Sequence, residues 1–327
     1  MSEQTPLIET RALKKYFKTS KGVLHAVDDI NMKIEKGTTL GVVGESGCGK
    51  STLGRVVLGL IGATSGEIYY KGRDTVKFSK REMRGLRKEM QIIFQDPYAS
   101  LNPRMSVSEI IAEPLRVNGI LRNRREIDKR VKELMDTVGI ASRLAYAYPH
   151  ELDGGRRQRV GIARALSVNP EFIVCDEPVS SLDVSIQAQI LNLMMDFQKE
   201  MGLTYMFITH DLSVVKHISD EIMVMYLGQC VERAPSKELF AQPKHPYTQA
   251  LLKAVPIPSL KNRGKPREIL PGEVTSPIDP QPGCRFAPRC KYAAERCRDP
   301  LAFQEISQNH FVACKLYEQA GREGEAQ

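Results

Sequence analysis

The sequence predicts an α/β fold built on a parallel β-sheet. The first observation is a glycine-rich loop at 44–52 that matches the pattern G-x4-G-K-[ST] at every fixed position. The second is the place of this loop between a short apolar, β-branched run at 38–43 and a helical run at 52–58. The third is that two later strand patterns, at 171–178 and 203–208, end in or just before polar residues. Together these patterns indicate a parallel sheet that presents its chemical groups at the carboxyl edge.

The glycine-rich loop has the chemistry of a phosphate-binding site. Successive backbone N–H groups and the positive end of the following helix would face the phosphates of a nucleotide. Lys50 is expected to reach the β and γ phosphates, and the Ser51 hydroxyl to bind Mg²⁺. We therefore predict a P-loop nucleotide site that consists of Gly44, Glu45, Ser46, Gly47, Cys48, Gly49, Lys50, Ser51 and Thr52.

Composition restricts the class of protein. The chain has 327 residues, of which 42% are hydrophobic, so it can fill a sizeable core. No window approaches the roughly 18 apolar residues of a membrane span, and the N-terminus lacks the apolar core of a signal peptide, so we expect a cytosolic protein. The net charge of +8 is spread over helical runs such as 80–88 and 122–125, which we interpret as solvated faces.

Other patterns place further elements around the phosphate loop. Alternation predicts antiparallel strands at 7–13 and 24–34, strands at 66–70 and 90–94, and a hairpin at 221–232. Helical periods run from Asp96 to about Val168, which indicates an inserted helical section, and a long helix is expected at 184–201. One amphipathic helix of the insertion would bury Ile127, Val131, Leu134, Met135 and Val138.

Several polar or aromatic residues are candidates for nucleotide chemistry. Asp176 would bind Mg²⁺ and Glu177 would orient or deprotonate the attacking water, although a carboxylate pair before Pro178 is also typical of a helix cap. His210 follows a buried strand and could contact the γ phosphate. Of the adjacent aromatics Tyr16 and Phe17, either packing or base stacking would explain the position.

The order of the motifs suggests a family. The phosphate loop is followed by Gln95, by Leu-Asp-Gly-Gly at 152–155, by Asp176-Glu177, by Ser-Ser-Leu-Asp at 180–183 and by His210. This series resembles the ATP-binding subunit of ABC transporters over residues 6 to about 250. The resemblance implies an ATPase with a RecA-like core, an antiparallel β subdomain and an inserted helical subdomain at about 96–168, all within an ATP-binding domain at 1–250.

The same resemblance implies individual roles. Phe17 would stack on adenine, Gln95 would couple Mg²⁺ and water to a transmembrane partner, Asp183 would bridge two ATP-binding domains, and His210 would sense the γ phosphate. Such domains pack head to tail, so the signature segment of one faces the ATP on the phosphate loop of the other. The signature residues concerned are Asp153, Gly154 and Gly155.

Three further segments resemble the dipeptide, oligopeptide and nickel permease ATPases of bacteria, in particular the second ATPase of the pair. They are Phe-Gln-Asp-Pro-Tyr-Ala-Ser-Leu-Asn-Pro at 94–103, His-Pro-Tyr-Thr at 245–248 and Gly-Cys-Arg-Phe-Ala-Pro-Arg-Cys at 283–290. This closer resemblance implies a peripheral protein at the cytoplasmic face of the membrane and an importer of peptides. Its partners would be a second, different ATPase, two transmembrane permease subunits and an extracytoplasmic substrate-binding protein, with no nucleic acid.

The signature departs from the family pattern. The family reads Leu-Ser-Gly-Gly-Gln, whereas this chain has Asp153 and Arg156 in place of the serine and the glutamine. An aspartate brings a like charge toward the nucleotide, and Arg156 could offset it by pairing with Asp153 or with the phosphate. We expect the ATP site that uses this signature to be altered, and the site that uses this chain's phosphate loop, Glu177 and His210 to be intact.

The predicted C-terminal extension at 251–327 is rich in proline and contains four of the seven cysteines. Thiolates in a cytosolic protein bind zinc or iron–sulfur clusters, and unliganded thiols are the alternative. Similar tails in the peptide-permease family carry a [4Fe–4S] cluster, so the resemblance favours that cluster over zinc. The ligands would be Cys284, Cys290, Cys297 and Cys314.

Two other functions are compatible with parts of the sequence. A soluble ABC ATPase that acts on nucleic acid or the ribosome would suit the positive charge, but such proteins ordinarily have two cassettes or a long coiled coil, and neither is present. A regulatory nucleotide-binding subunit with little hydrolysis would suit Asp153. The sequence does not identify the transported solute.

Overall fold

The computed structural model describes residues 5–254 and 276–318, and the chain forms two compact units. The first unit is made of residues 5–7, 34–39 and 77–208, and the second of residues 8–33, 40–76, 209–254 and 276–318. The predicted helical insertion therefore lies in the first unit and the cysteines of the extension in the second. Among the described helices, none combines the length and the apolar character that a bilayer span requires.

The first unit contains a parallel sheet in the order β6-β7-β8. Its strands are β6 (Met90–Ile93), β7 (Phe172–Asp176) and β8 (Thr204–Ile208). Every residue of β7 and β8 is buried, which explains why both strands are continuous apolar runs without alternation. The register places Asp176 opposite Ile208, so both strands end at the same edge. The buried strands predicted at 171–178 and 203–208 are confirmed.

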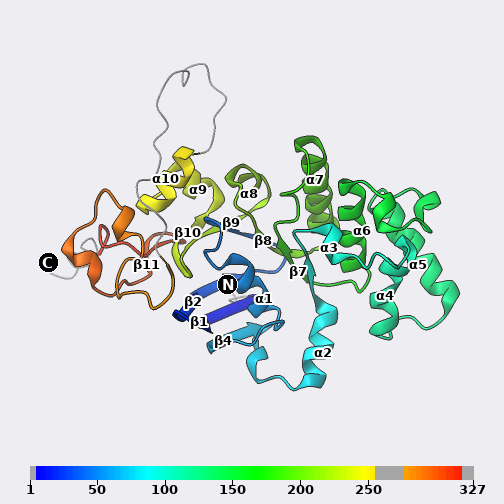
Figure 1. The fold of residues 1–327 in the computed structure, drawn as a ribbon, viewed down its shortest axis with the longest axis horizontal. Coiled ribbons are helices and arrows are strands. Elements are labelled where there is room, and N and C mark those ends of the chain that lie inside the picture. Colours follow the sequence, from blue (N-terminus) through cyan, green and yellow to red (C-terminus); the bar gives the residue numbers. More distant parts are fainter. Residues whose placement is uncertain (1–4, 255–275, 319–327) are drawn as a thin grey trace, which may run out of the picture. The chain divides into compact units, whose positions relative to one another are not determined.

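Helices form the rest of the first unit. They are α2 (Lys80–Glu89), α3 (Pro97–Ser100), α4 (Val107–Val117), α5 (Arg124–Thr137), α6 (Gly154–Leu166) and α7 (Val184–Met201). Helices α4, α5 and α6 lie against one another (Figure 1). The predicted apolar face of α5 is buried in this cluster, and Val138, which follows the helix, is fully buried too. The helical insertion is therefore confirmed.

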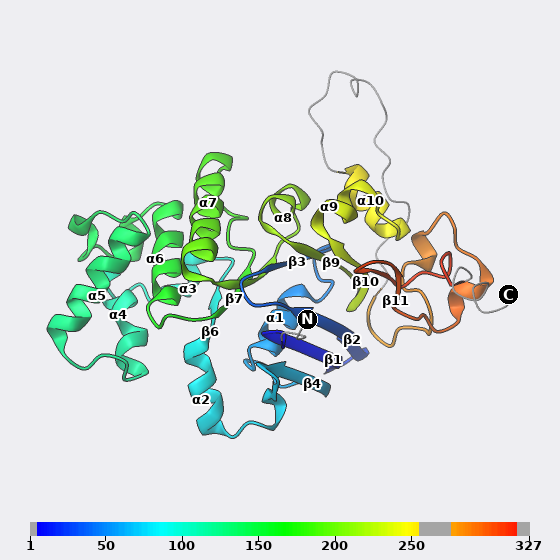
Figure 2. The same ribbon diagram turned by 180° about the vertical axis from the view of Figure 1, so that it is seen from behind.

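The second unit contains an antiparallel sheet in the order β2-β1-β4-β5. Its strands are β1 (Ile8–Thr19), β2 (Gly22–Ile34), β4 (Ser65–Tyr70) and β5 (Arg73–Asp74). Strand β1 lies between β2 and β4 (Figure 2), and its register with β4 shifts between Arg11 and Lys14. The two predicted N-terminal strands are confirmed, and both are longer than the alternation indicated.

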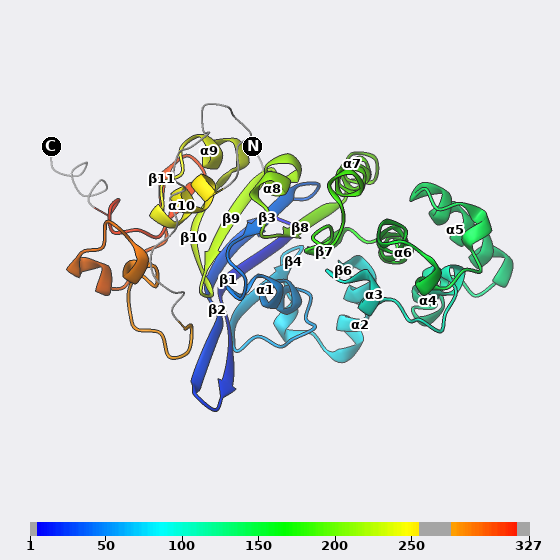
Figure 3. The same cartoon turned by 45° about the horizontal axis from the view of Figure 1, so that its top comes forward.

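A second run of strands in this unit has the order β11-β12-β10-β9-β3, in which only β3 and β9 pair in parallel. The strands are β3 (Thr39–Val43), β9 (Glu221–Tyr226), β10 (Gln229–Pro235), β11 (Gln304–Ser307) and β12 (His310–Val312), and the helices are α1 (Lys50–Val57), α8 (Leu212–Ile218), α9 (Ser236–Ala241) and α10 (Pro246–Ala254). Strands β9 and β10 form the predicted hairpin (Figure 3). Its turn residues Leu227 and Gly228 both have positive φ, of 44° and 88°, as a tight two-residue hairpin turn requires.

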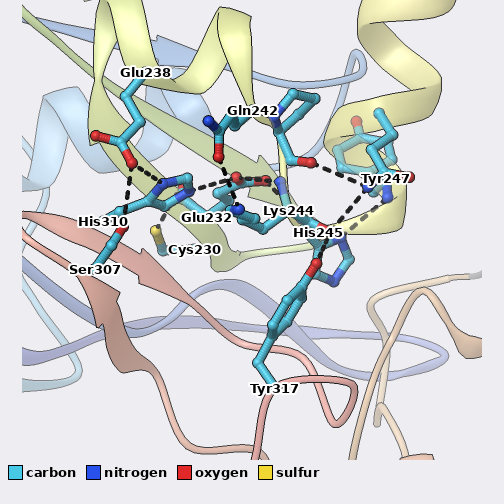
Figure 4. Close-up of polar contacts among 12 residues, drawn as sticks. Cys230, Glu232, Glu238, Gln242, Lys244, His245, Tyr247, Ser307, His310 and Tyr317 are labelled. Atoms are coloured by element: carbon cyan, nitrogen blue, oxygen red, sulfur yellow. Dashed lines mark hydrogen bonds and ion pairs between the residues drawn. The ribbon is translucent and has the colours of Figure 1, made fainter. Parts of the chain in front are cut away.

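The C-terminal residues are attached to this sheet through a buried carboxylate. Glu232 on β10 is fully buried and accepts hydrogen bonds from the backbone N–H groups of Lys244 (2.7 Å) and His245 (2.8 Å). Its Oε1 also lies 2.7 Å from Nε2 of His310, whose Nδ1 lies 3.2 Å from Glu238 (Figure 4). Strand β12, which contains His310, pairs with β10 beside this cluster. Residues 304–312 thus complete the sheet as two short strands that the sequence patterns did not predict.

Candidate functional site

The phosphate loop follows the buried strand β3, and its last three residues, 50–52, form the first turn of α1. The predicted strand and helix are confirmed, and the helix begins two residues earlier than the pattern indicated. Gly44 and Gly49 have φ values of 154° and 103°. A Cβ at Gly44 would lie 2.2 Å from the carbonyl oxygen of Met225, and one at Gly49 would lie 1.9 Å from that of Ala26. Neither position can hold a side chain without moving backbone, so the loop requires glycine there.

Lys50 is the charged group of this loop. Its side chain is 5% exposed, and Nζ donates to the carbonyl oxygens of Gly44 (2.8 Å) and Glu45 (3.0 Å). The ammonium is therefore held at the mouth of the loop by the same backbone that would surround a phosphate. Ser51 follows in the first turn of α1.

His210 lies at the same end of strand β3. The neighbouring residue Thr209 is buried, and its N–H donates to the carbonyl oxygen of Val42 (3.1 Å). Asp211 then caps α8 by accepting from the N–H of Ser213 (2.8 Å). These bonds fix the exposed His210 beside the strand from which the phosphate loop departs. The second unit thus brings together the phosphate loop and the predicted γ-phosphate sensor.

The structure distinguishes the two adjacent aromatics of β1. Tyr16 stacks on His25 with ring centroids 3.9 Å apart, and its hydroxyl donates to the carboxylate of Asp28. Burial, followed by the bond with Asp28, raises the pKa of Tyr16 well above its ordinary value. Phe17 is half-buried, with the ammonium of Lys15 4.8 Å from its ring centroid. Tyr16 is committed to packing, which leaves Phe17 as the aromatic suited to stack on a base.

The carboxyl edge of the first unit's sheet presents three predicted residues. Asp176 is the last residue of β7 and is 3% exposed. Glu177 follows with a left-handed φ of 49°, and its N–H donates to the carbonyl oxygen of Ile208 (2.9 Å). Its carboxylate accepts a hydrogen bond from Nε2 of Gln95 (2.9 Å). The structure therefore brings Gln95 and Glu177 into direct contact, although they are 82 positions apart.

The alternative role of this carboxylate pair, a helix cap, does not hold. The next helix after Glu177 is α7, which begins at Val184 and is capped by Asp183. The Asp183 carboxylate accepts from the N–H of Ile186 (2.9 Å). Neither Asp176 nor Glu177 is therefore the N-cap of α7.

The signature segment forms the start of α6. Asp153 is its N-cap, with Oδ1 accepting from the N–H of Arg156 (2.8 Å), and its Oδ2 lies 3.1 Å from the Arg156 guanidinium. Gly155 packs against Ile186, because a Cβ there would lie 2.7 Å from Cγ2 of that residue. The signature therefore presents a charge pair beside α7 and the exposed Asp183.

The predicted catalytic residues are divided between the two units. The phosphate loop, Phe17 and His210 belong to the second unit, whereas Gln95, Asp176, Glu177, the signature and Asp183 belong to the first. In the second unit, the phosphate loop and His210 lie at one end of β3, and Phe17 lies on β1. In the first unit, Asp176 and Glu177 lie at the end of β7, and the signature and Asp183 lie at the starts of α6 and α7.

The four cysteines of the extension line one cavity. Burial, together with the three neighbouring thiols, raises the pKa of Cys284 to about 11. No group of three or more His, Cys, Asp or Glu side chains is arranged to hold a metal ion in residues 5–254 and 276–318. The predicted ligands thus share one cavity without forming a metal-site geometry.

Two residues near the phosphate loop were assigned no role from the sequence. Tyr247 on α10 accepts a hydrogen bond from the backbone N–H of Glu45 (2.9 Å), and Arg289 forms an ion pair with the Glu45 carboxylate (2.9 Å). Arg289 is 244 positions away from Glu45. No local pattern could have indicated either contact, because the partners meet only through the tertiary fold.

Comparisons with known proteins agree with these observations. The family model described as ABC transporter matches residues 27–180, and the model for the oligopeptide/dipeptide transporter C-terminal region matches residues 231–297. The chain is 51% identical to the oligopeptide transport ATP-binding protein OppF of Haemophilus influenzae, covering 92% of this chain and 91% of that one. It is 48% identical to AppF, an oligopeptide transport ATP-binding protein of Bacillus subtilis, covering 97% and 99%.

A solved structure of an ATP-binding cassette has a similar fold. The ATP-binding cassette MJ0796, determined as a dimer in a post-hydrolysis state with ADP and Pi, aligns with a TM-score of 0.65 and 28% identity. The alignment covers 70% of this chain and 98% of the cassette.

Proposed function

This chain belongs to the ABC transporter family, in the oligopeptide/dipeptide group, and from that premise we propose that it hydrolyses ATP to drive the import of peptides. The single observation that carries the proposal is the joint match of an ATP-binding cassette and an oligopeptide/dipeptide transporter C-terminal region in one chain. This second region also argues against a soluble ABC ATPase that acts on nucleic acid or the ribosome.

The residues described above supply the chemistry of hydrolysis. Lys50 and the loop N–H groups bind the β and γ phosphates, and Phe17 stacks on adenine. Glu177, held by Gln95, orients a water molecule and accepts its proton as the water attacks the γ phosphorus and the bond to the β-phosphate oxygen breaks. His210 donates to the γ phosphate.

Mg²⁺ fits the donor set that this chain provides. Ser51, Gln95 and the buried carboxylate of Asp176 would hold the ion, because hydroxyl, amide and carboxylate oxygens are the ligands it prefers. When bound, Mg²⁺ neutralises charge on the phosphate oxygens.

The chain works as one half of an ATPase pair on a membrane complex. Asp153 of the signature and Asp183, which are both exposed, would face the partner, so that each ATP is enclosed by two chains. The second ATPase is a different chain, and the complex also contains two transmembrane permeases and an extracytoplasmic binding protein. The protein is accordingly peripheral, at the cytoplasmic face of the membrane. The support for this assembly is the similarity to peptide transport ATP-binding proteins.

We also propose that the four cysteines of the extension would supply the ligands of a [4Fe–4S] cluster, with zinc as the alternative. The support is that all four thiols line one cavity, since such a cluster takes four cysteine ligands. Iron analysis and the visible absorption spectrum of anaerobically purified protein test this. We expect a brown protein that loses its iron and its absorption in the Cys290→Ser variant, but not in the Cys230→Ser variant of a cysteine outside the extension. A colourless wild-type protein containing zinc would select the alternative, and one with neither metal would contradict both.

Purification of the tagged chain from gently solubilised membranes tests the assembly. We expect a second ATPase and two membrane subunits to be recovered, and ATP hydrolysis by this complex to rise with a peptide-loaded binding protein. Recovery of ribosomes or nucleic acid, with no membrane subunit, would contradict the importer.

A further inference from the structure

We propose that Arg289, in the C-terminal extension, is a positioning residue of the ATP site that neutralises Glu45 of the phosphate loop so that the loop can accept a triphosphate. The inference rests on the proposed ATP binding at this loop. It makes the extension part of the nucleotide site, in addition to any metal held by its cysteines.

The ion pair is close and largely shielded from water. Nη1 of Arg289 donates to both carboxylate oxygens of Glu45, at 2.9 and 3.2 Å. The side chain of Arg289 is only 6% exposed and that of Glu45 is 26% exposed. Arg289 also lies 3.5 Å from the hydroxyl of Tyr226 at the end of β9. Salt screens a charge pair at this depth far less than it screens a surface pair. Loss of the arginine would therefore leave the Glu45 charge largely uncompensated.

The extension holds Arg289 in place with aromatic packing. Arg289 ends a short 3-10 turn, Ala287–Arg289, which follows Phe286. The Phe286 ring lies 5.3 Å from both Tyr226 and Tyr247, with an edge-on angle of 86° to Tyr226. These three rings are almost completely buried. The turn that carries Arg289 is therefore anchored against the core of the second unit.

A residue of α10 that precedes the extension holds the backbone of Glu45. The hydroxyl of Tyr247 accepts from the Glu45 N–H at 2.9 Å. Residue 45 is thus fixed twice, through its N–H by Tyr247 and through its carboxylate by Arg289. Both contacts come from residues inside the 231–297 match to the oligopeptide/dipeptide transporter C-terminal region.

The charge of Glu45 gives these contacts a role in nucleotide binding. Glu45 is the only acidic residue of the loop at 44–52, and it directly follows Gly44, whose carbonyl bonds Lys50. A triphosphate brings several negative charges to this loop. An unpaired carboxylate there would repel the ligand, whereas a carboxylate paired with a buried guanidinium is close to neutral.

Equilibrium titration of the full-length chain with a fluorescent ATP analogue tests the proposal, because binding does not require the partner ATPase. We expect Arg289→Gln to weaken the affinity by about tenfold, the loss expected from one unbalanced charge–charge contact at a partly hydrated site. Glu45→Gln should bind as tightly as the wild type or more tightly. The double variant should regain wild-type affinity, because no carboxylate remains to be neutralised. Arg298→Gln, which removes the same charge from an exposed position of the extension, should have no effect.

The outcomes separate charge compensation from a structural role. Wild-type affinity in Arg289→Gln, or a double variant as weak as the single one, would overturn the inference. If Arg289→Gln does not fold, as judged by circular dichroism, Glu45→Gln alone decides, and a weakened affinity in that variant overturns the inference. A wild-type chain that binds no nucleotide would overturn the proposed function together with this inference. The results for the variants described above would overturn the inference alone.

Discussion

The charge pair of the signature allows a sharp prediction about ATP turnover. The substitution is Arg156→Gln, which leaves Asp153 at the start of α6 without its guanidinium partner 3.1 Å away. If the signature faces the γ phosphate held by the partner ATPase, the assembled transporter should hydrolyse ATP more slowly, because an uncompensated carboxylate now meets the phosphate.

The magnitude follows from the exposure of the two side chains. Asp153 is 60% and Arg156 is 51% exposed, so the pair adds only about 0–1 kcal/mol to folding and the variant should remain folded. A carboxylate about 4 Å from a phosphate charge costs between ~1 kcal/mol at the dielectric of water and ~4 kcal/mol at a protein surface. Because the side chain of Asp153 is largely exposed to water, we expect a repulsion energy near the lower end of this range. We therefore expect a rate decrease of about tenfold, or ~1.4 kcal/mol.

Steady-state ATPase activity of the reconstituted transporter measures this effect. The double variant Asp153→Ser with Arg156→Gln keeps an N-cap on α6, since serine caps as well as aspartate, and removes both charges. Its turnover should reach or exceed that of the wild type. Arg125→Gln on α5 is the matched control for loss of one positive charge. Unchanged turnover in Arg156→Gln, or a double variant no faster than the single one, would refute the reasoning.

Two further predictions concern the catalytic carboxylate and the buried cluster around Glu232. Glu177→Gln should lower ATP turnover by at least about a hundredfold while affinity for a fluorescent ATP analogue is retained, because only the proton acceptor is lost. His310→Gln should destabilise the protein by roughly 3 kcal/mol, measured by chemical denaturation followed by circular dichroism, because it leaves the buried Glu232 without its charged partner. Burial alone would lower the pKa of His310, but its bonds with Glu232 and Glu238 raise it above the ordinary 6.5. The stability that this group adds is complete below pH 6.5 and is lost as the pH rises through the higher pKa of the folded state, so the variant should lack this decline.

Local patterns predicted most of the candidate site because its chemistry is local. The phosphate loop consists of consecutive residues that begin directly after a strand and end in the first turn of a helix. Asp176 and Glu177 directly follow an apolar run of the length typical of a buried strand. The hypothesis that Arg156 pairs with Asp153 needed only three positions of helical spacing, and the structure contains that pair. In contrast, the stacking of Tyr16 on His25 and its bond with Asp28 involve another strand, which the sequence pattern does not contain.

The sequence by itself determined which nucleotide chemistry this protein performs, because motif order and residue type are written along the chain. Only the tertiary structure decided what surrounds that chemistry. The pairing of Arg289 with Glu45 joins residues 244 positions apart, and strand β12 adds to β10 although its three residues are too few for a recognisable pattern. Such contacts form because burial of aromatic and charged groups makes distant segments meet, and that burial depends on the whole fold rather than on local periodicity.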